Sequence, residues 1–181
     1  MNTIKRRLVA VVATLAIMAS TAFVASAQQR TDDMRTANKV RKELVTLPYY
    51  GVFDNLAYKL EDGTLTLYGQ VVDATTRKDA ERRVKKIEGV DRVVNNIQVL
   101  PLSGFDNTIR VRTYRTLART GGLYRYFLGA NPSIHIIVNR GNVALEGVVS
   151  NKMDSQLAYI TARGVPGTFS VTNNLRVEKD N

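Results

Sequence analysis

The spacing of apolar residues along positions 33–99 changes between two patterns, and each change marks a predicted element. Helical spacing over 33–45, with Asp33 as a candidate N-cap, predicts a first helix. The apolar positions then alternate on both sides of the tight turn Asp62-Gly63, which predicts a β-hairpin. A helix followed by a hairpin is therefore expected in the first third of the chain.

The spacing becomes helical again between residues 80 and 87, where Asp73 is a candidate N-cap and Gly89 a candidate stop. Alternation returns over 93–99 and predicts a third strand. The predicted order of elements is α-β-β-α-β.

The same order occurs a second time, because residues 63–99 match residues 141–177 at ten identical positions without a gap. Such internal similarity indicates two copies of one small folding unit. Turn, bulge and helix-stop roles are assigned to the glycines shared by the copies, which are Gly63, Gly69, Gly89, Gly141, Gly147 and Gly167. The shared pairs Asn95-Asn96 and Asn173-Asn174 are expected to satisfy local backbone groups.

We therefore predict an α+β protein of two tandem α-β-β-α-β units. Each unit has a small three-stranded mixed sheet with two helices packed on it. A unit of about 70 residues is near the lower limit for an independent core, so the two are expected to pack together or on a partner.

The first 27 residues have the features of a secretory signal peptide. Basic residues 5–7 precede an apolar run over 8–18, and Ala25-Ser26-Ala27 follows as a cleavage site. The run is short for a spanning helix, so cleavage after Ala27 is favoured over an uncleaved N-terminal anchor. The predicted organisation is a signal peptide at 1–27, a first domain at 28–101 and a second at 102–181.

Charge is unevenly divided between the two copies. The chain carries a formal net charge of +10, and removal of the signal peptide with its three basic residues leaves +7. Residues 31–101 hold 12 basic against 11 acidic residues, whereas residues 102–181 hold 10 against 5. The second copy is thus the basic one and predicts an anionic partner. In an exported protein we favour phospholipid over nucleic acid.

The motifs Asp62–Val71 and Ile87–Asn96 resemble those of the BON domain, and two such units behind a signal peptide resemble the osmotically inducible periplasmic protein Y family. The resemblance implies a periplasmic α+β protein without enzymatic activity. It further implies binding to phospholipid surfaces in envelope maintenance or stress protection, or alternatively a periplasmic chaperone or adaptor role toward polypeptides or outer-membrane proteins. Lipid anchoring through an N-terminal cysteine is excluded, because the chain has no cysteine.

The first helix of the second copy and the aromatic segment after it form the candidate lipid-binding site. Three arginines of this helix fall within an arc of about 60° at 100° per residue, and no acidic residue lies between Arg110 and Arg125. Arginine pairs with phosphate, while Tyr and Phe favour the headgroup level. The alternative is a solvated charged face with aromatics that cover the core. The candidate residues are Arg112, Arg115, Arg119, Tyr124, Arg125, Tyr126 and Phe127.

Catalytic and metal-binding patterns are not found in the sequence. His135 is the one histidine and alternates with isoleucines on a predicted strand, which makes a poor metal site. No cofactor is expected. For the chaperone alternative, sheet edges and the segment Leu123–Leu128 would contact client chains.

Overall fold

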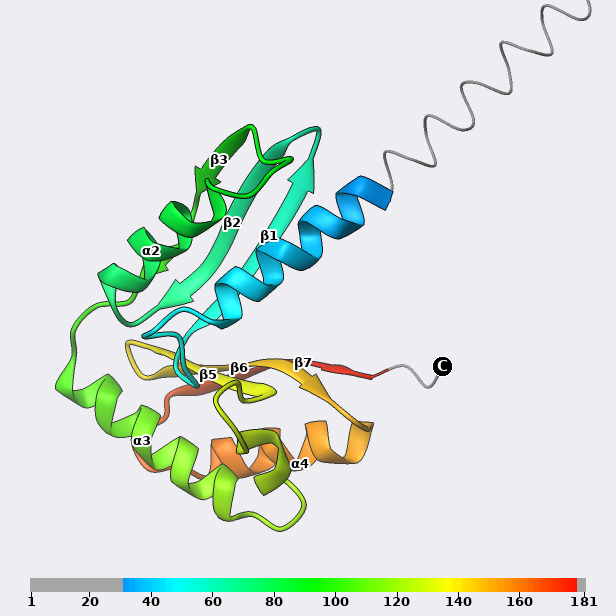
Figure 1. The fold of residues 1–181 in the computed structure, drawn as a ribbon. Coiled ribbons are helices and arrows are strands. Elements are labelled where there is room, and N and C mark those ends of the chain that lie inside the picture. The colour runs from blue at the N-terminus through cyan, green and yellow to red at the C-terminus, as the bar shows by residue number, and fades with distance from the viewer. Residues whose placement is uncertain (1–30, 179–181) are drawn as a thin grey trace, which may run out of the picture.

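The computed structural model describes residues 31–178, so the predicted signal peptide and its cleavage site lie outside the described residues. Two α/β units lie one above the other, and the sheet of the second unit lies between its own helices and the first unit (Figure 1). The predicted α+β class and the two tandem units are confirmed.

The first repeat begins with helical residues 31–45 and continues with a mixed sheet of order β1-β2-β3. β1 and β2 are antiparallel, whereas β3 and β4 both pair in parallel with β2 and together form one interrupted third strand. The elements are β1 (Asn55–Glu61), β2 (Thr64–Val71), α2 (Ala74–Val84), β3 (Arg92–Asn95) and β4 (Gln98–Val99).

The second repeat has the same plan, with sheet order β5-β6-β7 and one addition. A short 3-10 helix, η1, lies in the segment between its first helix and its first strand. The elements are α3 (Gly104–Arg119), η1 (Tyr124–Phe127), β5 (Ile134–Asn139), β6 (Asn142–Val149), α4 (Lys152–Arg163) and β7 (Ser170–Val177).

The local signals in the sequence correctly predict the hairpin turn and the start of α2, and the same kind of cap occurs in the second repeat. Asp62 and Gly63 have φ values of 45° and 72°, as a turn with two left-handed residues requires. The carboxylate of Asp73 accepts the Thr75 N–H at 2.7 Å at the start of α2, and Asn151 caps α4 in the same manner.

Two local predictions are wrong. Asp33 does not cap the first helix, because it lies inside helical residues 31–45. The third strand of the first repeat is not continuous, since residues 96–97 separate β3 from β4. Next to this break the Asn95 Oδ1 accepts a hydrogen bond from the Ile97 N–H at 3.2 Å. The Oδ1 of the equivalent Asn173 accepts one from the Leu175 N–H in the same way. The prediction that the two asparagine pairs satisfy backbone groups is thereby confirmed for Asn95 and Asn173, whereas the Asn174 side chain donates to the Glu146 carboxylate at 2.6 Å.

Glycine is required at Gly69 and Gly147 because the backbone at the start of the neighbouring strand approaches each of them closely. A Cβ on Gly69 would lie 1.9 Å from the Asn55 carbonyl oxygen, and one on Gly147 would lie 2.0 Å from that of Ser133. Both glycines also have φ near +120°, a region that other residues rarely adopt.

Replacement of Gly69 or Gly147 with alanine is expected to destabilise the protein by about 1–3 kcal/mol, because strain and overlap with backbone add together. Gly104→Ala is the control, since Gly104 has open space around its Cα and no positive φ. Urea denaturation would measure all three. Equal stability of the Gly69 and Gly104 variants would contradict the proposed close approach.

The two repeats have separate apolar cores that meet through the segment before β1. Val52 and Phe53 from the first repeat pack against the core of the second. The Ile136 N–H of β5 donates to the Val52 carbonyl at 2.7 Å. The expectation that the two copies pack together is confirmed by these contacts.

Candidate functional site

The outer face of α3 carries the three predicted arginines, which we call the basic face: Arg112, Arg115 and Arg119. All three side chains are exposed. Arg112 makes one long hydrogen bond, to the Pro166 carbonyl at 3.5 Å, and none of the three forms an ion pair within residues 31–178.

A shallow surface hollow lies between Arg115 and Arg119, lined also by Thr116 and Thr120. The two threonine hydroxyls donate to backbone carbonyls of the preceding turn, at 2.8 Å each. The guanidinium groups are therefore the donors left to meet an anion at this hollow.

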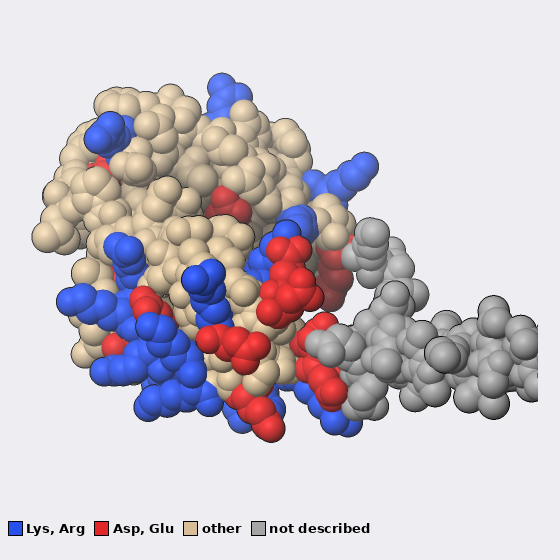
Figure 2. All heavy atoms as spheres, turned by 90° about the horizontal axis from the view of Figure 1, so that it is seen from above, with Lys and Arg blue, Asp and Glu red and all other residues tan. Residues whose placement is uncertain are grey.

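Helix α2 of the first repeat differs from α3, because several of the basic side chains on it and directly after it are paired with acidic ones. Arg82 pairs with Asp79 at 2.7 Å, and Lys85 pairs with Glu81 at 2.5 Å. The face of the first repeat in Figure 2 accordingly shows positive and negative side chains next to each other. The uneven charge of the two repeats thus appears on the surface as paired basic side chains near α2 and unpaired arginines on α3.

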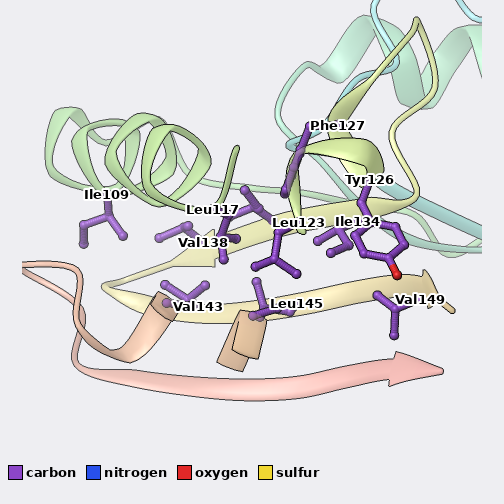
Figure 3. Close-up of a cluster of buried hydrophobic side chains, with 13 residues drawn as sticks. Ile109, Leu117, Leu123, Tyr126, Phe127, Ile134, Val138, Val143, Leu145 and Val149 are labelled. Carbon is purple, nitrogen blue, oxygen red and sulfur yellow. The ribbon is translucent and has the colours of Figure 1, made fainter. Parts of the chain in front are cut away.

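The aromatic part of the predicted site needs correction, because Tyr126 and Phe127 are only 6% and 8% exposed. Both lie in the core of the second repeat (Figure 3). The Tyr126 hydroxyl accepts the Ser150 N–H at 2.9 Å and donates to Asp154 at 2.5 Å. These two rings are structural and are not available to a membrane surface.

In the same segment, Arg125 is paired with an acidic residue and Tyr124 is not. The Arg125 guanidinium is bound to the Asp154 carboxylate and to the Tyr126 hydroxyl, and these hydrogen bonds raise its pKa. It is therefore paired, whereas Tyr124 is exposed at the surface. Of the seven candidate residues, Tyr126 and Phe127 are buried, and Arg125 is paired although its side chain is 46% exposed. The three arginines of the basic face and Tyr124 are exposed and have no acidic partner in the described residues.

A pair of exposed aromatic rings that sequence patterns did not reveal lies at the start of α3. Phe105 is 49% exposed, Phe169 is 74% exposed, and their ring centroids are 5.8 Å apart. Phe105 precedes Arg112 by seven residues, or two helical turns, and so lies on the same side of α3. That spacing could have predicted the position of Phe105 from the sequence. Phe169 comes from the loop after α4, so its contact with Phe105 is visible only in the structure.

Behind the basic face, Arg110 and Asp106 are buried and hold α3 on the sheet. Arg110 donates to the Val138 carbonyl at 2.8 Å, and burial lowers its pKa while the charge of Asp106 opposes that shift. The Asp106 carboxylate accepts the N–H groups of Arg140 and Gly141 at 2.9 and 2.8 Å. These contacts fix which side of α3 faces solvent.

His135 lies at the junction of the repeats, where its ring contacts the segment before β1. Its Nδ1 lies 3.2 Å from the Gly51 carbonyl, so Nδ1 is the donor, and Nε2 faces the Tyr50 hydroxyl at 3.4 Å. Burial lowers the pKa of His135, and it raises that of Tyr50 to about 12. In the described residues no group of three or more acidic, histidine or cysteine side chains is arranged to hold a metal ion.

The stability of the protein is expected to fall as the pH falls from about 7 to 5.5, near the ordinary histidine pKa of about 6.5. The unfolded chain protonates its histidine more readily than the folded one does, so acid favours unfolding by up to about 1.4 kcal/mol per pH unit. His135→Asn keeps a donor for the Gly51 carbonyl and does not titrate. Urea denaturation at several pH values should show a smaller slope for this variant, and equal slopes would contradict the burial effect.

The part of the chain between residues 31 and 178 contains no helix of the length and apolar character needed to cross a membrane. The family model described as BON domain matches residues 32–101 and 106–179. None of the curated proteins matches the chain.

Solved structures of CdsD, a structural protein of the type III secretion system of Chlamydia trachomatis, are among those similar to this chain. Its C-terminal domain is 11% identical, with a TM-score of 0.28 over 78% of this chain and 96% of that one. A second structure of CdsD is 12% identical, with a TM-score of 0.29 over 79% and 93% of the two chains.

Proposed function

Since the chain belongs to the BON domain family, with two copies over most of its length, we propose that it is an exported, non-catalytic module of the cell envelope. In this proposal the second BON domain binds anionic phospholipid surfaces in the periplasm, in envelope maintenance or stress protection. The sequence features of a signal peptide support export.

The observation that carries this proposal is the basic face of α3, where three exposed arginines have no acidic partner in the described residues. Cations near an anionic bilayer are each attracted by about 1 kcal/mol. The adjacent Phe105–Phe169 pair supplies exposed apolar area of the kind that inserts at the headgroup level. A basic surface next to exposed aromatic rings suits an anionic interface.

Co-sedimentation with vesicles tests the proposal directly. Vesicles of phosphatidylcholine mixed with phosphatidylglycerol should retain the protein, whereas vesicles of phosphatidylcholine alone should not. Equal binding to both vesicle types, or to neither, would reject the proposal.

The alternative function is a periplasmic chaperone or adaptor for polypeptides, and the outer edge of β7 favours it. The sheet order places β7 at an edge over eight residues, and an open edge can pair with an extended chain. The segment Leu123–Leu128 contributes less than the sequence predicted, because Leu123 is also buried. Suppression of client aggregation without vesicle binding would favour this alternative.

A further inference from the structure

A cleft of about 350 Å³ opens between the two repeats, away from the basic face. Its lining comes from helix 31–45, the segment before β1 and β1 itself in the first repeat, and from Arg176 of β7 in the second. This volume lies at the lower end of the range for small-molecule sites.

The charged side chains at this cleft are both arginines. Arg41 and Arg176 both line it, and neither guanidinium group makes an ion pair or hydrogen bond with any residue from 31 to 178. No acidic side chain lines the cleft. The two guanidinium groups, one from each repeat, therefore present uncompensated positive charge to any occupant.

The rest of the lining is apolar in character. Val45 and Leu56 are half-buried and contribute aliphatic surface, whereas Leu44 lines the cleft but is only 3% exposed. Two tyrosines also line the cleft, but their hydroxyls face other partners: Tyr58 donates to the Ala37 carbonyl at 2.7 Å, and Tyr50 faces His135. The phenol rings thus add apolar surface, and recognition of a polar group is left to the arginines.

We propose that this cleft binds a small amphipathic anion, in which a phosphate or carboxylate group is carried on a short aliphatic chain. The anionic group lies between Arg41 and Arg176, and the chain packs against Val45 and Leu56. Because the two arginines come from different repeats, the bound anion joins the repeats and stabilises their arrangement. The site is separate from the basic face and does not depend on its function.

Calorimetric titration of the purified protein with octyl phosphate and with octanoate tests the proposal and identifies the preferred headgroup. At least one of the two should bind saturably and raise the melting temperature. Octyl glucoside has the same chain without the charge, and inorganic phosphate has the charge without the chain, so both should bind at least tenfold more weakly. Binding of either control as tightly as the better amphiphile would overturn the proposal, as would a peptide carboxyl terminus that binds more tightly than both amphiphiles.

Arg41→Gln and Arg176→Gln should each weaken amphiphile binding by about tenfold, as expected when one charge-assisted hydrogen bond is removed. Arg163→Gln is the matched control, because Arg163 is exposed on the second repeat, does not line the cleft, and has its guanidinium over the ring of Tyr159. An equal loss in the control would overturn the assignment.

The two proposed sites can fail independently. Glutamine at Arg112, Arg115 and Arg119 should leave octyl phosphate binding unchanged, whereas glutamine at Arg41 and Arg176 should leave vesicle binding largely unchanged. Loss of amphiphile binding in the first variant would overturn the cleft as a separate site.

Discussion

Replacement of Asp106 with alanine is expected to lower the free energy of unfolding by about 3–5 kcal/mol, the largest effect of a single substitution considered for this protein. The Asp106 carboxylate is buried and accepts two N–H groups at the β5–β6 turn, from Arg140 and Gly141. Alanine would leave both donors without that partner. It would also remove the negative charge that favours the buried cation of Arg110.

Two control variants separate these contributions in urea denaturation. Asp106→Asn keeps an acceptor for one of the two N–H groups but removes the charge, so an intermediate loss is expected. Ser103→Ala removes only the cap at the start of α3, where the hydroxyl accepts the Asp106 N–H at 3.1 Å, and should cost about 1 kcal/mol. A loss for Asp106→Ala no larger than that for Ser103→Ala would contradict the role assigned to the carboxylate.

Local features of the fold were predictable from the sequence because their causes are local. The turn at Asp62-Gly63 needs two residues with positive φ, and Asp-Gly provides them at low cost. The cap at Asp73 depends on an N–H two residues away. The second unit was predictable because residues 63–99 and 141–177 share ten identical positions at a fixed spacing.

The environment of residues in the candidate site was not predictable in the same way. The hydrogen bond from Arg110 to the Val138 carbonyl spans 28 residues and appears only in the fold. Tyr126 and Phe127 lie on a 3-10 helix, whose orientation has no clear periodic signal, and the hydroxyl of Tyr126 finds partners after β6 and in α4. An aromatic-rich loop therefore suggested a surface role, although the rings fill the core.

The candidate lipid-binding surface has one part that the sequence predicts and one part that depends on tertiary contacts. The basic face follows from spacing within one helix, so its exposure could be predicted. Phe169 reaches Phe105 from the loop after α4, 64 residues later in the chain. The cleft at Arg41 and Arg176 likewise requires the packing of the two repeats.

Substitution of Arg112, Arg115 and Arg119 together by glutamine is expected to weaken binding to anionic vesicles by roughly a hundredfold. Each basic residue near an anionic surface contributes about 1 kcal/mol, and these three side chains have no acidic partner in the described residues that would reduce the effect. High salt should produce a similar loss for the unmodified protein, because the Debye length falls to about 3 Å at 1 M. Vesicle co-sedimentation as a function of salt measures both effects.

The matched control lies in the first repeat, where Arg82, Lys85 and Lys86 are replaced by glutamine. The first two are already paired with Asp79 and Glu81, so their removal should change vesicle binding by much less than the α3 substitution does. Equal losses in the two triple variants would show that the second repeat does not carry the binding surface.

Replacement of Phe105 and Phe169 by alanine separates apolar insertion from charge attraction at the same surface. Because both rings are substantially exposed, their removal should affect folding little, whereas it should reduce vesicle binding to a similar degree at low and high salt. A loss that disappeared as salt increased would assign the rings to positioning of the arginines. Binding unchanged at every salt concentration would leave the three arginines of α3 as the whole of the membrane contact.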